Sequence, residues 1–71
     1  MTLREAQATA EAGRYFIAIG SKGMRWRCRW TRPRHGLFEI VGRADRPLRK
    51  PLECAVNGAP VTRVEIEGRG R

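Results

Sequence analysis

The sequence contains few of the side chains from which catalytic sites are built. Its 71 residues include one serine, one histidine and one aspartate, at Ser21, His35 and Asp45. A Ser/His/Asp triad would need all three, yet they fall in two predicted turns and a long loop, and no nucleophile elbow surrounds the serine. Glu65 and Glu67 are two residues apart and would face the same side of a predicted strand, but this is the solvated side of an alternating pattern. The sequence therefore predicts a protein that is not an enzyme.

Cysteine is also scarce, with only Cys28 and Cys54. Both fall on predicted inward faces of strands, and a disulfide would form only if those strands were neighbours. Without an export signal, two buried free thiols are the expected state. Adding His35 gives the spacing Cys-x6-His-x18-Cys, which matches no zinc site and supplies only three ligands. We expect no metal and no cofactor.

Long apolar segments are absent as well. No apolar run approaches the roughly 18 residues of a membrane span, and the N-terminus lacks the basic flank and apolar stretch of a signal peptide. The expectation is a cytoplasmic protein without a membrane partner. A chain of this size buries only about 60% of the surface exposed by its unfolded form, which leaves one thin core and no large pocket for a small-molecule substrate. We expect one domain over residues 1–67, followed by a disordered basic tail over 68–71.

Positive charge, by contrast, is in excess. The 15 Lys and Arg side chains oppose seven Asp and Glu, for a formal net charge of +8. The segment from Lys22 to Lys50 holds ten of the basic residues and only two acids, whereas the rest of the chain has five of each sign. Codon bias would explain a preference for arginine over lysine, but not the neutral flanks. The asymmetry indicates a basic face and an anionic partner, either nucleic acid or an acidic protein surface.

Hydrophobic periodicity predicts one helix followed by about five short strands. Thr2 and Glu5 have the spacing of a capping box, and the Ala-rich segment after them predicts a helix of about eleven residues that stops at Gly13. From Arg14 onward the apolar residues recur at every second position. The predicted strands cover approximately 15–19, 24–31, 37–41, 52–56 and 62–66.

The segments between these strands carry turn signals. Residues 20–23 (Gly-Ser-Lys-Gly) superficially suggest a phosphate loop, but they lack the GxxxxGK[ST] spacing and predict a hairpin turn. Residues 43–50 predict a charged loop, and Asn57-Gly58 predicts a further hairpin. We therefore predict an α+β fold, with an N-terminal helix packed on an antiparallel sheet of four to five short strands. A small five-stranded β-barrel with a helical plug is the alternative.

The predicted strand over 24–31 has the clearest pattern in the chain. Its side chains alternate, so that one face holds Met24, Trp26, Cys28 and Trp30 and the other holds Arg25, Arg27, Arg29 and Thr31. The apolar set is expected to enter the core, because a domain with only five aromatic residues needs both tryptophans there. The three arginines, here named the arginine comb, have the side chain best shaped for bidentate contact with phosphate or carboxylate.

The comb is the predicted centre of a partner-binding surface. The predicted contacts are Arg25, Arg27, Arg29, Arg32 and Arg34, with secondary basic contacts at Lys22, Arg43, Arg46, Arg49 and Lys50. The competing interpretation is an ordinary salt-bridged surface, in which Glu39 or Glu53 on a neighbouring strand pairs with the comb. Two carboxylates do not neutralise five arginines, which favours the binding interpretation.

These features predict a small, non-enzymatic protein that engages a polyanion, in the first place the backbone of DNA or RNA, without base-sequence specificity. No RNP1-type motif is present, and a single helix excludes helix-turn-helix. The alternative is a phage or mobile-element inhibitor of the anti-CRISPR type, which would bind an acidic surface of a host protein or nucleoprotein complex. Short single-domain chains without catalytic residues are common in that class, and the same arginines would serve both functions. A homo-oligomer through a sheet edge or the tryptophan face is left open.

Overall fold

The computed structural model describes residues 1–43 and 46–66. Its elements in chain order are α1 (Leu3–Ala8), β1 (Tyr15–Gly20), β2 (Arg25–Arg32), the 3-10 turn η1 (Pro33–His35), β3 (Leu37–Arg43), β4 (Arg46–Ala55) and β5 (Val61–Ile66). The predicted tail over 68–71 lies outside the described residues, as do Asp45 and Glu67. Within the described ranges, no helix has the length and apolar character needed to cross a membrane.

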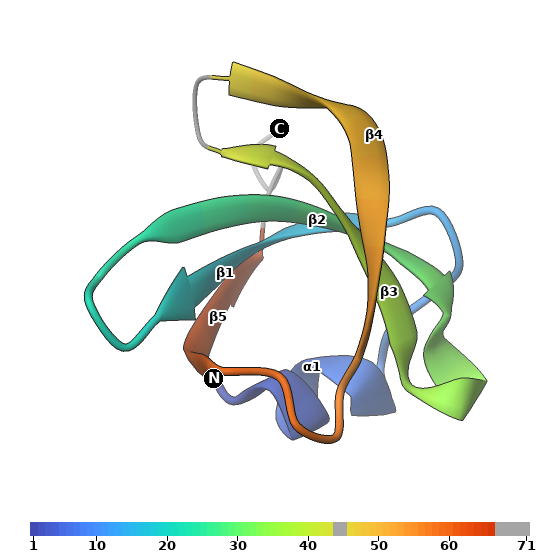
Figure 1. The fold of residues 1–71 in the computed structure, drawn as a ribbon. Helices are drawn as coiled ribbons and strands as arrows, with labels where there is room; N and C mark the ends of the chain where they lie inside the picture. Colours follow the sequence, from blue (N-terminus) through green and yellow to red (C-terminus); the bar gives the residue numbers. More distant parts are fainter. Residues whose placement is uncertain (44–45, 67–71) are drawn as a thin grey trace.

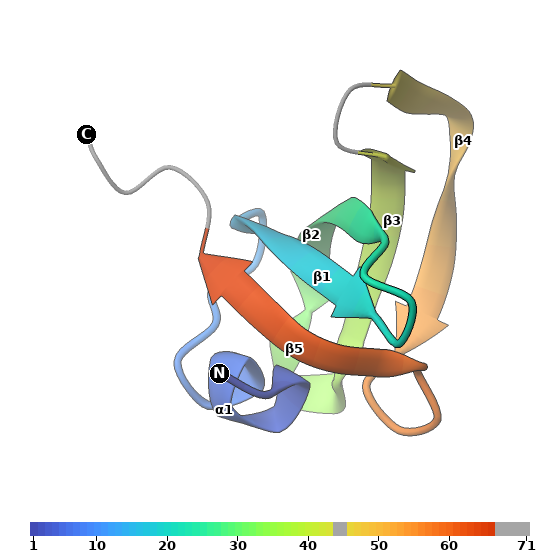
Figure 2. The same ribbon diagram turned by 90° about the vertical axis from the view of Figure 1, so that its left-hand side faces the viewer.

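The strands form one antiparallel sheet in the order β4-β3-β2-β1-β5. Strands β1 to β4 follow one another as neighbours, and β5 returns to the far edge beside β1 (Figure 1). The sheet is curved, and α1 lies beneath it, near β5 (Figure 2). Because β4 and β5 end as separate edges, the sheet is open and the predicted α+β fold is confirmed, rather than the closed barrel.

The helix begins as predicted but ends earlier than predicted. The Thr2 hydroxyl accepts a hydrogen bond from the Glu5 N–H (3.1 Å) and the Thr2 N–H donates to the Glu5 carboxylate (2.8 Å), so the capping box is confirmed. The helix has only six residues and stops well before Gly13. After Ala8 the chain turns towards the sheet: the Gly13 N–H donates to the Trp30 carbonyl (2.8 Å) and the Trp30 N–H donates to the Arg14 carbonyl (2.9 Å). These bonds extend the β1–β2 ladder back to Gly13, at the predicted end of the helix.

One predicted hairpin is confirmed and the other is wrong. The Gly20 N–H donates to the Met24 carbonyl at 2.9 Å and closes the β1–β2 turn. Asn57-Gly58, in contrast, follows β4 at one edge of the sheet and leads to β5 at the opposite edge. An Asn-Gly pair specifies only a local reversal of the chain. Strand β5 takes β1 as its partner, with Val64 opposite Ala18.

The segment predicted as a charged loop contains the first half of β4. Strand β4 starts at Arg46, and Pro47 lies opposite Gly42 of β3. Between that pair and the pair Ile40–Leu52, β4 has four residues where β3 has one. Residues 48–51 therefore form an irregular bulge. Charge and proline are tolerated here because an edge strand is paired on one side only. Residues 46–51 therefore form part of a strand although apolar and polar side chains do not alternate there.

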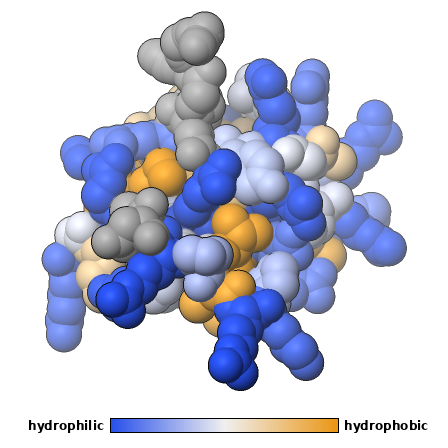
Figure 3. All heavy atoms as spheres, turned by 90° about the horizontal axis from the view of Figure 1, so that it is seen from above, coloured by the Kyte–Doolittle hydropathy of each residue, from blue (hydrophilic) through white to orange (hydrophobic). Residues whose placement is uncertain are grey.

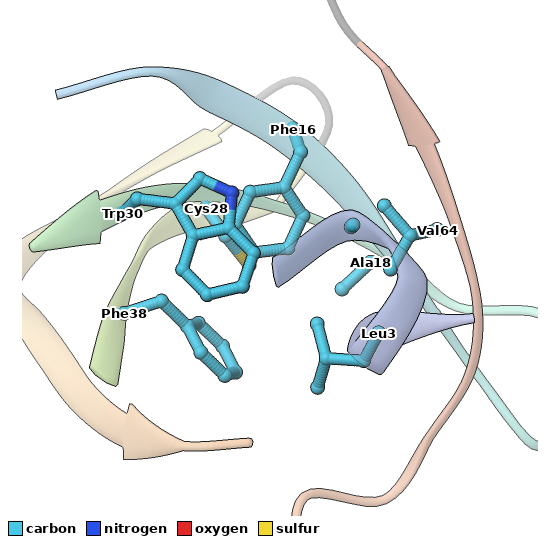
Figure 4. Close-up of a cluster of buried hydrophobic side chains, with 8 residues drawn as sticks. Leu3, Phe16, Ala18, Cys28, Trp30, Phe38 and Val64 are labelled. Atoms are coloured by element: carbon cyan, nitrogen blue, oxygen red, sulfur yellow. The ribbon is translucent and has the colours of Figure 1, made fainter. Parts of the chain in front are cut away.

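An aromatic cluster on the inner face of the sheet forms the core. The rings of Phe16 and Trp30 stack at a centroid distance of 4.8 Å, and Phe38 meets both edge-on, at 5.5 and 5.7 Å. Leu3 of α1 lies at the edge of this cluster (Figure 4), and Ala6 of the same helix also belongs to it. Such ring pairs contribute about 0.5–1.5 kcal/mol each beyond the burial of their area. The predicted burial of Trp30 is confirmed, with 3% of the residue exposed.

The helix covers only one end of this inner face. Towards the β1–β2 turn, Trp26 is only partly buried, and Met24 is 36% exposed. The prediction that Met24 enters the core was therefore wrong, because the residue precedes β2 and belongs to the turn. In the cross-strand register Trp26 lies opposite Arg43, and Arg43 lies opposite Arg46. We call the part of the inner face formed by these three residues and Met24 the open end.

Gly42 provides a test of the close contact between β3 and β4. A Cβ at this position would lie 2.4 Å from the Arg46 carbonyl oxygen and 2.7 Å from the Pro47 Cα, and both are backbone atoms. Because the backbone must shift to accommodate it, we expect Gly42→Ala to lower the free energy of unfolding by about 1–3 kcal/mol, measured by urea denaturation. Gly20→Ala is the matched control, since the nearest atom to its Cβ would lie 3.7 Å away. Equal stability losses in the two variants would contradict this packing.

Candidate nucleic-acid interface

The arginine comb lies on the outer face of the sheet, as its alternation predicts. The side chains of Arg25 and Arg29 are 48% and 41% exposed. Both are nevertheless held by carboxylates: Arg25 donates to Glu65 at 2.6 Å, and Arg29 donates to Glu39. The hydrogen bond with Glu39 raises the pKa of the Arg29 guanidinium, with the charge of Glu39 acting in the same direction. The competing salt-bridged interpretation of the comb thus applies through Glu39.

The third comb arginine lies over an aromatic ring. The Cζ atom of Arg27 is 4.3 Å from the centroid of the Tyr15 ring, within the range of a cation–π contact. In the register of β1 and β2, Ile17 lies opposite Arg27 and Ile19 lies opposite Arg25. Ile19 is only 7% exposed although it lies on the outer face. We attribute this to the aliphatic stems of the comb, which extend across β1 and shield its apolar side chains.

The charges of the outer face nearly cancel. Following the register from the comb across the neighbouring strands gives four arginines and three glutamates: Arg25, Arg27, Arg29, Arg63, Glu39, Glu53 and Glu65. The Glu65 carboxylate also lies 3.8 Å from the Arg63 guanidinium. The comb therefore accounts for little of the +8 net charge.

Glu65 is the site residue that the sequence analysis missed. It is 40 residues from Arg25 in the chain. The two meet because β5 pairs with β1, which places Glu65 opposite Ile17, next to Ile19 and its partner Arg25. The alternation of Arg63 and Glu65 with Val64 was visible in the sequence, but it does not specify which strand lies beside β5.

Arg32 and Arg34 lie beyond the comb, around η1. Together with His35 they line a shallow surface depression of about 470 Å³, whose opposite wall includes Glu11 from the segment after α1. All four side chains belong to exposed residues. Among residues 1–43 and 46–66, neither arginine forms an ion pair. Their role as partner contacts stays a prediction.

Four further cations that have no carboxylate partner among the described residues lie on the β3–β4 pair. We call Arg43, Arg46, Arg49 and Lys50 the basic arm. All four are exposed, and none has an ion pair with a carboxylate of the described residues. In Figure 1 the arm-bearing end of β3 and β4 projects above the rest of the sheet. Lys22, in the β1–β2 turn, is likewise exposed.

Apolar side chains lie among these cations. The Arg43 guanidinium is 5.4 Å from the centroid of the Trp26 ring. On β4, Leu52 is 58% exposed and Leu48 is 38% exposed. Seen from above, this side of the molecule has hydrophobic residues surrounded by hydrophilic ones (Figure 3). The surface therefore combines unpaired positive charge with accessible apolar and aromatic area.

The thiols are free, as predicted. Cys28 is buried, and Cys54 is only partly buried. Burial, with a smaller contribution from the nearby Cys54, raises the pKa of Cys28 to about 12. In the described part of the chain, no three His, Cys, Asp or Glu side chains are arranged to hold a metal ion.

The Arg25–Glu65 pair predicts a measurable titration. The hydrogen bond from Arg25 holds the pKa of Glu65 below its usual range. The stabilisation from this pair is therefore present above the unfolded-state pKa and is lost as the pH falls through the folded-state pKa. We expect Arg25→Gln to return the Glu65 pKa towards its ordinary value in a carboxyl-detected NMR titration. Arg63→Gln, which removes the more distant guanidinium, is the control and shifts it less. An ordinary Glu65 pKa in the wild type would show that the pair is absent in solution.

The two thiols predict different reactivities. Only the thiolate reacts with a disulfide reagent, and burial raises the pKa of both Cys28 and Cys54. Since Cys28 is fully buried, we expect one slow labelling phase near neutral pH from Cys54, and a second thiol only after unfolding. Cys54→Ser then removes the first phase. If labelling of the native protein persisted in that variant, the burial of Cys28 would be wrong.

Comparison with known protein families, with curated proteins and with solved structures finds no match to this chain.

Proposed function

We propose that the protein is a non-enzymatic binding protein that engages the phosphate backbone of nucleic acid without a preference for base sequence. The observation that carries this proposal is the basic arm, with four exposed cations that have no carboxylate partner in the described chain. Each cation that neutralises a phosphate releases condensed counterions, which supplies most of the free energy of non-specific binding. The arm and the open end beside it form the proposed contact surface.

The arm is favoured over the comb because its charges are available. Arg25 and Arg29 must weaken their bonds to Glu65 and Glu39 before they can bind a phosphate. Exposed ion pairs are worth only about 0.2–1 kcal/mol, so the comb is hindered rather than excluded as a contact. We therefore place the comb arginines at the periphery of the proposed surface. Arg32 and Arg34 are placed there too, because they lie around η1, at the opposite end of β3 from Arg43.

The absence of sequence preference follows from the shape of the arm. Base sequence is read by side chains that are held rigidly in a groove, whereas phosphate contacts only position the protein. Three of the four arm residues lie on the edge strand β4, which has an irregular bulge over residues 48–51. Its long side chains are exposed and are not fixed by neighbouring carboxylates of the described residues. Such groups suit the uniform negative charge of a nucleic-acid backbone.

A second candidate function is supported by the exposed leucines. Leu52 and Leu48 lie on the same strand as the cations, and large apolar side chains beside arginine are typical of protein interfaces. In this proposal the arm binds an acidic surface of a host protein or nucleoprotein complex, as an inhibitor of phage or mobile-element origin would. Both functions use the same surface, so the partner distinguishes them.

Two triple variants with the same charge change test the proposed surface. We compare Arg43→Gln/Arg46→Gln/Arg49→Gln with Arg25→Gln/Arg27→Gln/Arg29→Gln for binding to unrelated DNA and RNA oligonucleotides at several salt concentrations. We expect the arm variant to lose most of the affinity and to reduce the slope of log K against log salt by about 2–3, roughly one for each phosphate contact. The comb variant should keep most of its binding.

Three other results would contradict the proposal or change its partner. Equal losses in the two variants would mean that only the net charge matters, and a greater loss in the comb variant would place the site on the outer face. If the wild type binds no nucleic acid at low salt, the nucleic-acid proposal fails. Nuclease-resistant binding to a purified acidic host protein, lost in the arm variant, would then support the second candidate function.

A further inference from the structure

Trp26 packs against the edge of the core without being buried in it. The other large rings of the inner face, Phe16, Trp30 and Phe38, contact one another at centroid distances below 6 Å and are at most 3% exposed. Trp26 is only partly buried at the edge of this cluster. Among the described residues its only ring contact is the Arg43 guanidinium.

The cross-strand neighbours of Trp26 differ in size and in exposure. Across the sheet it lies between Ala18 of β1, which is small and buried, and Arg43 of β3, which is long and exposed. Leu3 and Ala6 of α1 belong to the buried aromatic cluster, and Trp26 packs against the margin of that cluster. The Arg43 guanidinium, which has no carboxylate partner in the described chain, lies 5.4 Å from the centroid of the indole.

We infer that Trp26 stacks against an unpaired base, so that the partner class is single-stranded nucleic acid; this inference rests on the proposed function. An aromatic face beside a track of cations is the arrangement by which proteins bind single strands without sequence preference, since every base has a π face. Arg43 lies beside the ring and Arg46 lies opposite Arg43 on the next strand, and both would hold the flanking phosphates. In a duplex the base faces are already stacked on each other and are not available to the indole.

The predicted chemistry separates two contributions to binding. Cations of the arm bind duplex and single strand alike, because both carry phosphates. Stacking on Trp26 adds affinity only for the single strand, by about 5- to 100-fold for one base. The site therefore predicts two separable effects. The preference for single strands should depend on Trp26, and the salt dependence of binding should depend on the arm.

The test measures the affinity of Trp26→Leu and Trp26→Phe for a thymidine oligonucleotide of about 15 nucleotides and for a duplex of the same length. We expect Trp26→Leu to lose at least about 5-fold in affinity for the single strand and less than 2-fold for the duplex. Trp26→Phe keeps a stacking face and should regain part of the single-strand affinity. In the wild type, the oligonucleotide should quench the emission of the partly buried Trp26 and leave that of the fully buried Trp30 unchanged.

Urea denaturation and near-UV circular dichroism show whether each variant is folded, because Trp26 also packs on the core. If Trp26→Leu does not fold, Trp26→Phe and the wild-type quenching decide. Three results would overturn the inference while leaving the proposed function in place. These are equal affinity of the wild type for single strand and duplex, an unchanged single-strand affinity in a folded Trp26→Leu variant, and the absence of quenching on binding. If the wild type binds neither oligonucleotide, the proposed function itself fails.

Discussion

The short length of α1 is the constraint on which the arrangement of the surface depends. The helix ends at Ala8, and the chain then turns so that Gly13 and Arg14 hydrogen-bond to Trp30 as an extension of the sheet. With six residues, of which Leu3 and Ala6 are buried, it can cover only the aromatic cluster. Two tryptophans of one strand therefore have different environments. Trp30 belongs to the buried cluster that the helix covers, and Trp26, four positions earlier on the same face, is only partly buried. A longer helix would have more apolar area with which to cover the open end.

The position of a strand in the sheet decides whether its arginines are paired. Strand β2 is central, with neighbours on both sides, so the comb meets Glu39 from β3 and Glu65 from across β1. Strand β4 is an edge, so Arg46 has a cross-strand neighbour on one side only, and that neighbour is Arg43. The same residue type is thus a structural element in the centre of the sheet and a source of unpaired charge at its edge. The alternation of arginines made the comb the clearest pattern in the sequence. The same regular spacing lets glutamates on adjacent strands form ion pairs with it.

The sequence was sufficient for the local features and insufficient for the distant ones. The capping box of Thr2 and Glu5, the Gly20–Gly23 turn and the alternation of β2 depend on neighbouring residues, and each was predicted correctly. The end of the helix, the pairing of β5 with β1 and the identity of β4 as a strand depend on contacts between remote segments, and these were mispredicted. For the candidate site, the outward direction of the comb was predictable, while its pairing with Glu65 was not, because it requires the sheet order.

The two edges of the sheet are protected in different ways, and this bears on why the basic arm exists. At the β5 edge the Val64 N–H donates to the Met1 carbonyl at 2.7 Å, so the N-terminal segment supplies a backbone partner. At the β4 edge the sequence supplies two prolines, a bulge and cations, which are the features that prevent edge-to-edge pairing of sheets. Like charges on the same strand of two copies repel each other, and the same charges attract a polyanion. The basic residues can therefore keep two copies of the sheet apart and also form a binding surface. The two roles are compatible, because cations on an edge strand that must remain unpaired stay available to a partner.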